Sequence, residues 1–222
     1  MPKWTKNAIP GAAGKLITHR RQSTAGGPFD QVFTVDEFSI RVKRVCETNC
    51  NNGWMNDLET AVRPFLKPMI GGVAKPLYRG GQEAVAAWAA KTALALNLAT
   101  PEKSAPLEHY REMNKTHRPP PNTYVWLAAY EMDGPIAYHH TTKLTLSDSR
   151  RSSHGYATTL AVGHLILQVV GHIGIEDVAP VKNLAGPLAK FQVWPFESDI
   201  TWPPPWVLDW GMVQTFSRIF EN

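Results

Sequence analysis

The stretch TYVWLAAYE (Thr123–Glu131) decides the fold class, because it opens a region whose composition is typical of β-strands. β-Branched and aromatic residues are also abundant in four later segments of the chain. These segments are Ile136–Leu146, Tyr156–Val162, His164–Val170 and Lys190–Trp194. Asp133-Gly134 and Ser147-Asp148-Ser149 have the composition of hairpin turns. The sequence therefore predicts a mainly antiparallel sheet in the second half of the chain.

Helical patterns precede this region. Apolar residues recur at three- and four-residue steps over Met55–Met69, which predicts a helix with one buried face. We expect Pro64 and Pro68 to kink or break that helix, because proline removes a backbone hydrogen bond. The alanine-rich stretch Gln82–Leu98 predicts a second helix. Two further helices are expected at Leu107–Lys115 and Asp209–Phe220.

The first half of the chain is less regular. Residues 1–30 contain many turn-forming residues, and alternation from Gln31 to Lys43 predicts two short strands. The prolines at 119–121 form a stiff linker, which predicts a boundary between residues 1–117 and 118–222, unless the two regions form one continuous domain. We therefore predict an α+β protein. A degenerate zinc-knuckle or ββα-like region and helices pack on the sheet, and a helix ends the chain.

Composition excludes several classes of protein. The chain has 222 residues, of which 43% are hydrophobic and 19% charged, and these values exclude a disordered protein. The most apolar run, Ala157–Val170, is interrupted by polar residues and is shorter than the roughly 20 residues of a membrane span. Two cysteines provide no disulfide framework, so we expect a reducing, cytoplasmic setting. The sequence indicates no oligomeric state.

Positive charge is concentrated at the start of the chain. Residues 1–50 hold eight lysines and arginines against four acidic residues, which accounts for the whole net charge of +4. Arg41, Lys43 and Arg44 lie just before the first cysteine and are candidate phosphate contacts for nucleic acid. The alternative interpretation is a solvated basic face with no such role.

The segment VCETNCNNGWMNDLE (Val45–Glu59) holds both cysteines and runs into the first predicted helix. Cys46 and Cys50 are candidate zinc ligands, because thiolates on a turn suit that ion. Structural zinc takes four ligands, and none of the eight histidines stands at ligand spacing from this pair. A reduced pair without metal is the alternative. Asn51 or Asn52 is a candidate N-cap of the helix that follows.

The segment from Val45 to Glu59 resembles the Val-Cys-x-x-Cys-Asn-Asn-Gly-Trp-Met-x-x-Leu-Glu motif of bacterial and phage proteins related to HNH endonucleases. Downstream helical segments and the tail of the chain are similar to the same family. The resemblance implies an N-terminal nuclease motif built from two cysteine pairs and a Glu-His-Val-x-Pro-x-Trp segment. In that family the histidine of the latter segment is the general base.

This chain departs from the family pattern where the chemistry resides. Met1-Pro2-Lys3-Trp4 resembles the end of the Glu-His-Val-x-Pro-x-Trp segment, so the catalytic histidine and the first cysteine pair have no counterpart here. Asn49 is an extra residue between Cys46 and Cys50. An HNH site needs a base to activate water and a divalent ion to stabilise developing charge. We assign no catalytic residue, and Asn51 stands where the motif has its final histidine or asparagine.

Three functional hypotheses follow. The first is a truncated, catalytically inactive relative of HNH endonucleases that retains contact with DNA. The second is a phage-type interaction protein that binds and inhibits a host protein through the aromatic, proline-rich segment Trp202–Trp206. The third is an active metal-dependent nuclease whose native chain begins further upstream.

Overall fold

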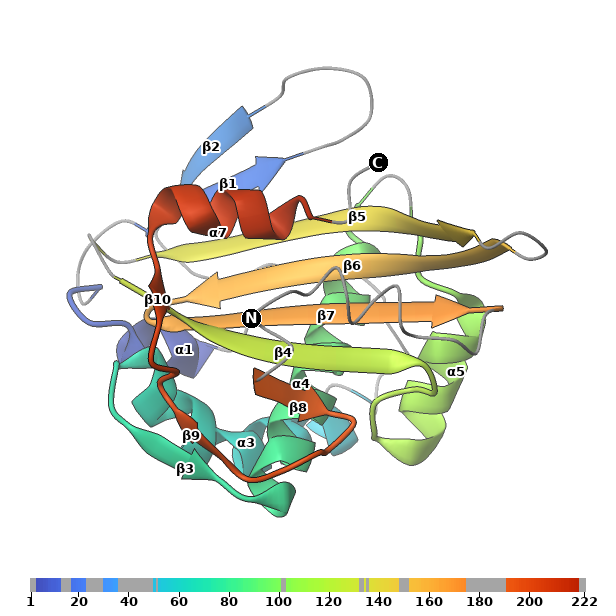
Figure 1. Cartoon of the computed structure of the whole chain (residues 1–222), viewed down its shortest axis with the longest axis horizontal. Helices are drawn as coiled ribbons and strands as arrows, with labels where there is room; N and C mark the ends of the chain where they lie inside the picture. The colour runs from blue at the N-terminus through green and yellow to red at the C-terminus, as the bar shows by residue number, and fades with distance from the viewer. Residues whose placement is uncertain are drawn as a thin grey trace.

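A computed structural model describes residues 3–12, 17–22, 30–35, 50, 52–100, 103–131, 134, 136–147, 152–174 and 191–219. The helices are α1 (Lys3–Ala8), α3 (Trp54–Ile70), α4 (Arg79–Asn97), α5 (Leu107–Thr116) and α7 (Trp210–Ser217). The strands are β1 (Ile17–Gln22), β2 (Asp30–Val35), β3 (Lys75–Leu77), β4 (Thr123–Tyr130), β5 (Ala137–Ser147), β6 (Ser152–Val162), β7 (Leu165–Ile173), β8 (Gln192–Trp194), β9 (Ile200–Trp202) and β10 (Val207–Leu208). The predicted α+β class is confirmed, with helices packed on a mainly antiparallel sheet (Figure 1).

The main sheet has the strand order β10-β4-β7-β6-β5, and β8 also pairs with β4. β5 and β6 pair along their whole length, which confirms the hairpin predicted around Ser147–Ser149. The hairpin predicted at Asp133-Gly134 is wrong, because β4 pairs with β7, β8 and β10 and not with β5. Between β4 and β5 the chain passes β7 and β6 and reaches the opposite edge of the sheet. The composition of the turn alone does not predict this connection.

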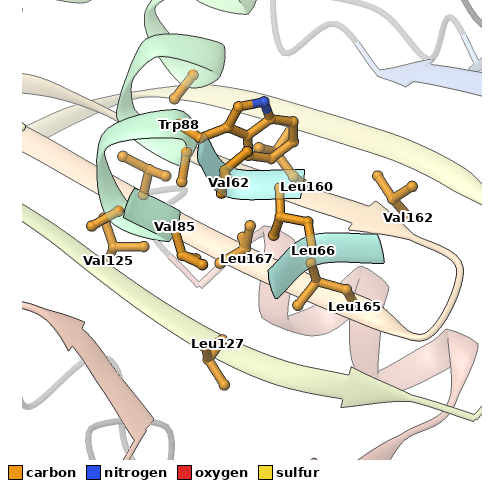
Figure 2. Packing of buried hydrophobic residues seen from close by; sticks show 14 of the residues in the cluster. Val62, Leu66, Val85, Trp88, Val125, Leu127, Leu160, Val162, Leu165 and Leu167 are labelled. Atoms are coloured by element: carbon orange, nitrogen blue, oxygen red, sulfur yellow. The ribbon is translucent and has the colours of Figure 1, made fainter. Parts of the chain in front are cut away.

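One face of the sheet is covered by α3 and α4. Because side chains alternate along a strand, the odd-numbered residues of β4 face these helices. Figure 2 shows the resulting core, in which α3, α4 and three strands contribute interlocking apolar side chains. The residues labelled there are Val62, Leu66, Val85, Trp88, Val125, Leu127, Leu160, Val162, Leu165 and Leu167. This core contains residues from both sides of the 117/118 boundary, which itself stays a prediction.

The opposite face of the sheet packs partly against α7. Ala128 and Tyr130 of β4 join Val213 and Phe216 of α7 in a second apolar cluster. Asp209 sets the start of this helix, because its carboxylate accepts a 2.7 Å hydrogen bond from the backbone N–H of Met212. The helix predicted at residues 209–220 is therefore confirmed in its position.

The first long helix differs from its prediction in one respect. α3 runs without a break to Ile70, although Pro64 and Pro68 lie inside it. Each proline removes one backbone hydrogen bond of the helix. Burial of Leu66 and Met69 on the opposite face offsets that loss, since both side chains are completely buried. The prediction of a break at these prolines is therefore wrong, whereas the alternative of a kink stays a prediction.

The N-terminal region contains structure that the sequence pattern did not reveal. β1 pairs with β2 in an antiparallel register from Ile17 opposite Val35 to Gln22 opposite Asp30. β2 confirms the strand predicted from Gln31, whereas the irregular structure predicted for residues 1–30 is wrong at α1 and β1. β1 has no alternation of apolar residues, so only its pairing with β2 identifies it as a strand. The second strand predicted before Cys46 lies outside the described residues.

Position 171 of β7 requires glycine, because the side chain directly opposite leaves no space for a larger residue. A Cβ at this position would lie 2.7 Å from ring atoms of Tyr156 on β6. Since Tyr156 is completely buried, its ring has little room to move. We predict that Gly171→Ala lowers the free energy of unfolding by about 1–3 kcal/mol through overpacking.

Urea unfolding of a double-mutant cycle tests this cause. In a Tyr156→Leu background, the same Gly171→Ala change should cost clearly less, because leucine leaves space for the methyl group. An equal cost in both backgrounds would exclude the steric explanation.

Candidate functional site

The motif that resembles the HNH family extends into the start of α3, where Trp54 contacts α5 and the residue that follows it. Its indole Nε1 donates a 3.2 Å hydrogen bond to Asn114 Oδ1. Its ring stacks on His117, with centroids 4.7 Å apart and ring planes 8° from parallel. His117 ends α5 in a left-handed conformation with φ 57°, which turns the chain at this point. Trp54 thus links two helices that lie far apart in the sequence.

A pocket of about 220 Å³ lies beside this contact, between α3, α4 and α5. Its apolar walls consist of Trp54, Met55, Leu94, Ala95, Tyr110 and Met113. Its polar residues are Lys91, Arg111 and Asn114. A mostly apolar recess with a few converging polar groups is the usual form of a ligand site, and this one has the size for a single ring rather than a drug-sized molecule.

The charge of Lys91 is compensated within the protein. Its Nζ lies 2.9 Å from Glu59 Oε1 and 5.9 Å from the centroid of the Trp88 ring. Lys91 is nearly buried, with 9% of its surface exposed, so this pairing stabilises an ammonium group that water reaches poorly. The exposed guanidinium of Arg111 is instead available to an anionic ligand, since no described residue pairs with it.

Tyr110 fixes the wall that α5 contributes. Its hydroxyl lies 3.2 Å from both the backbone oxygen of Leu94 and Oδ1 of Asn97. Burial raises the pKa of Tyr110 to about 12, so it remains a neutral donor. Asn97 in turn binds Ser104 and Ala105, which connects the end of α4 to the segment before α5. This network holds α4 and α5 at a fixed separation.

A buried polar group lies on the inner side of α5. His109 contacts the edge of the Tyr156 ring, with centroids 5.8 Å apart. Burial lowers the pKa of His109 to about 4, and a hydrogen bond to the backbone of His172 offsets part of this effect. Burial also raises the pKa of Tyr156, and Tyr110 adds to this effect. His109 and Tyr156 are both neutral at pH 7, and their contact joins α5 to the sheet.

Most of the site residues predicted from the sequence cannot be placed. Arg41, Lys43, Arg44, Cys46 and Asn51 lie outside the described residues. Their roles as nucleic-acid contacts, metal ligand and motif residue therefore stay predictions.

Cys50 is described, and its sulfur lies 3.6 Å from Asn114 Oδ1, next to the Trp54 contact. The sulfur is part of a disulfide in this structure, and in that state it has no thiolate to offer zinc. The predicted zinc site therefore stays a prediction for the reduced chain. Across the described ranges, no group of three or more histidine, cysteine or acidic side chains has the arrangement of a metal site.

Of the two predicted caps of α3, Asn51 lies outside the described residues and Asn52 does not occupy the N-cap position. Gly53 occupies the N-cap position of α3, and glycine has no side chain with which to cap the first turn. Asn52 is exposed and does not cap the helix. The backbone oxygen of Gly53 accepts hydrogen bonds from the backbone N–H groups of Asn56 and Asp57, which start the helix.

The aromatic segment near the C-terminus contributes mainly to the core. Trp202 is 1% exposed and belongs to the main apolar cluster. Trp206 is half-buried and packs edge-on against Phe191, with centroids 4.8 Å apart. The predicted partner surface therefore does not include Trp202, because this side chain is buried. Gln168 and His172 are fully buried on β7.

The chain matches no protein-family model, no curated protein and no solved structure. The resemblance to HNH endonucleases consequently stays a prediction. No helix in the described ranges combines the length and apolar character needed to cross a membrane. Sequence reasoning missed Arg111, Asn114 and His117, although their spacing of three residues places them near one another at the end of α5.

The buried neutral state of His109 predicts a pH dependence of stability. Its pKa is about 4 in the folded protein and 6.5 in the unfolded chain, so between these values only the unfolded chain is protonated. Stability is therefore complete above pH 6.5 and decreases as the pH falls toward 4. We expect a loss on the order of 2 to 3 kcal/mol over this window.

Chemical unfolding at several pH values measures this slope. His109→Gln should flatten it, because glutamine does not titrate. Since burial also lowers the pKa of His172, a residual slope of the same sign is expected. An unchanged slope in the variant would show that His109 is not the titrating group.

Proposed function

We propose that this chain is a relative of HNH endonucleases that binds nucleic acid, and we assign it no hydrolytic step. The observation that carries the proposal is the placement of Trp54, from the family-like motif, beside a cluster of exposed cations on and after α5. These cations are Arg111, Lys115 and Arg118. The motif residue is thus part of a surface on which aromatic and basic groups meet.

The two acidic and two basic residues of α5 occupy neighbouring positions on the helix. Arg111 and Lys115 are one helical turn apart and share a face. Glu108 and Glu112 lie within one turn of these cations, and neither they nor Lys115 line the pocket. Arg111 is the one charged residue of α5, within the described part of the chain, that lines the pocket. Phosphate contacts by lysine and arginine provide most of the affinity of non-specific nucleic-acid binding.

The stacked pair adds a second type of contact. His117 is exposed and already lies flat against Trp54. A base that stacks on an aromatic ring gains binding energy with little dependence on its identity. Aromatic and basic groups on one surface are the combination that single-stranded nucleic acids use.

A second candidate function, binding to a host protein, is favoured by a different surface. Three large apolar side chains are exposed on and next to β10 and α7: Val207 (45%), Met212 (53%) and Ile219 (37%). Met212 also borders a shallow hollow with Asp209 and Thr215. A stoichiometric partner recovered by the wild type but not by Met212→Asp would favour this function.

The nucleic-acid proposal predicts binding that depends on salt and on α5. Single-stranded and duplex DNA should bind at low salt and dissociate as salt is raised, because binding releases counterions. Lys115→Gln/Arg118→Gln should weaken binding and reduce the logarithmic salt slope for single strands by about 1 to 2, the value for two lost phosphate contacts. Fluorescence anisotropy with labelled oligonucleotides measures both quantities.

A matched control removes two cations elsewhere. Lys67 on α3 and Arg218 after α7 are exposed and line neither hollow, so Lys67→Gln/Arg218→Gln has the same net charge as the test variant. It should retain most of the affinity. Equal losses in both variants would indicate a general charge effect, and no binding at low salt would reject the proposed function.

A further inference from the structure

The pocket between α3, α4 and α5 has properties that indicate what it accepts. Its volume of about 220 Å³ exceeds that of an engineered cavity of roughly 150 Å³ that binds benzene, and it is smaller than the roughly 300–1,000 Å³ of drug-sized sites. It therefore has room for one ring system and not for a whole cofactor. The rest of any ligand must lie outside the pocket.

The pocket interior favours a neutral group. Lys91 is its only buried cation among the described residues, and Glu59 neutralises it at 2.9 Å. A carboxylate or phosphate placed inside would have to displace Glu59 from Lys91. The walls include aromatic and thioether side chains, among them Trp54, Tyr110 and Met113, which pack well against flat, polarizable rings.

The mouth of the pocket offers hydrogen-bond donors in a fixed orientation. Asn114 Oδ1 accepts the Trp54 indole N–H, which orients the amide group. The NH₂ of this amide donates to no residue in the described part of the chain. An oriented amide NH₂ matches the carbonyl oxygens and ring nitrogens on the edge of a base. An aliphatic or phenyl side chain of a protein partner has no acceptor to offer it.

The charged residues outside the pocket favour an anionic group, whereas the interior favours a neutral one. Arg111 lies at the pocket, and Lys115 lies one turn further along the exposed side of α5. A ligand that fits both regions has a neutral ring attached to an anionic chain. This description fits a nucleotide within a strand.

We propose that this pocket binds one unpaired base of a single-stranded nucleic acid, with the adjacent phosphates on Arg111 and Lys115. The inference rests on the proposed function and makes it more specific. In a duplex the base is held in the stack, so it reaches the pocket only after unpairing. Single strands should therefore bind more tightly than duplexes of equal charge.

The decisive experiment compares oligothymidylate with an abasic oligomer of the same length, using the wild type and Ala95→Phe. Ala95 is half-exposed and lines the pocket, so phenylalanine fills the space and leaves every cation in place. We expect Ala95→Phe to bind oligothymidylate about tenfold more weakly, the order expected for one lost base–aromatic stack. Binding of the abasic oligomer should be weaker than that of oligothymidylate and insensitive to the variant.

The outcomes separate the inference from the proposed function. If the wild type binds both oligomers equally and with strong salt dependence, nucleic-acid binding stands and the base pocket is rejected. If neither oligomer binds at low salt, both proposals fail. If Ala95→Phe binds oligothymidylate as the wild type does while its unfolding temperature is unchanged, the pocket is not the site.

A measurement on the unmodified protein covers the case in which Ala95→Phe does not fold. Methionine methyl groups labelled with ¹³C report on the pocket through Met55 and Met113, whereas Met212 on α7 lines the other hollow and is the internal control. Titration with thymidine should shift the first two signals and leave Met212 unchanged. Shifts of all three signals, or of none, would overturn the proposal.

Discussion

The structure depends on the burial of two central strands on both of their faces. Every residue of β4 is buried, and every residue of β7 except Ile173. Two apolar faces require two covering layers. α3 and α4 supply the first layer, and α7 covers part of the second face (Figure 1). Because Trp88 of α4 and Val125 of β4 belong to one core, the helices cannot shift without opening the interior.

This constraint also explains why a pocket forms at α5. The inner side of α5 is fixed to the sheet by His109 and Met113, both buried. Trp54 holds its C-terminal end against α3, and Tyr110 holds it against α4. The three helices are therefore connected at separate points, and the space between these points is not filled by side chains. A recess bounded by fixed elements needs little rearrangement to receive a ligand.

Periodicity in the sequence was sufficient for α3, α4, α5 and α7 and for most strands of the main sheet, because those patterns are local. It failed where the outcome depends on distant partners. Nothing within Asp133-Gly134 indicates that β4 pairs with β7, and β1 is recognised only through β2. For the same reason, the motif drew attention to Trp54 but not to Asn114 and His117, which lie about sixty residues further along the chain.

The outer edge of β4 has a consequence for synthesis of the protein. β8 and β10 pair there and belong to the last 31 residues of the chain. While the ribosome translates the segment after β7, the hairpins can assemble, but this edge has no strand to pair with. At roughly 5–20 residues per second, the interval lasts a few seconds. The nascent chain therefore passes through a stage with an open, apolar strand edge, which is the type of surface that chaperones protect from aggregation.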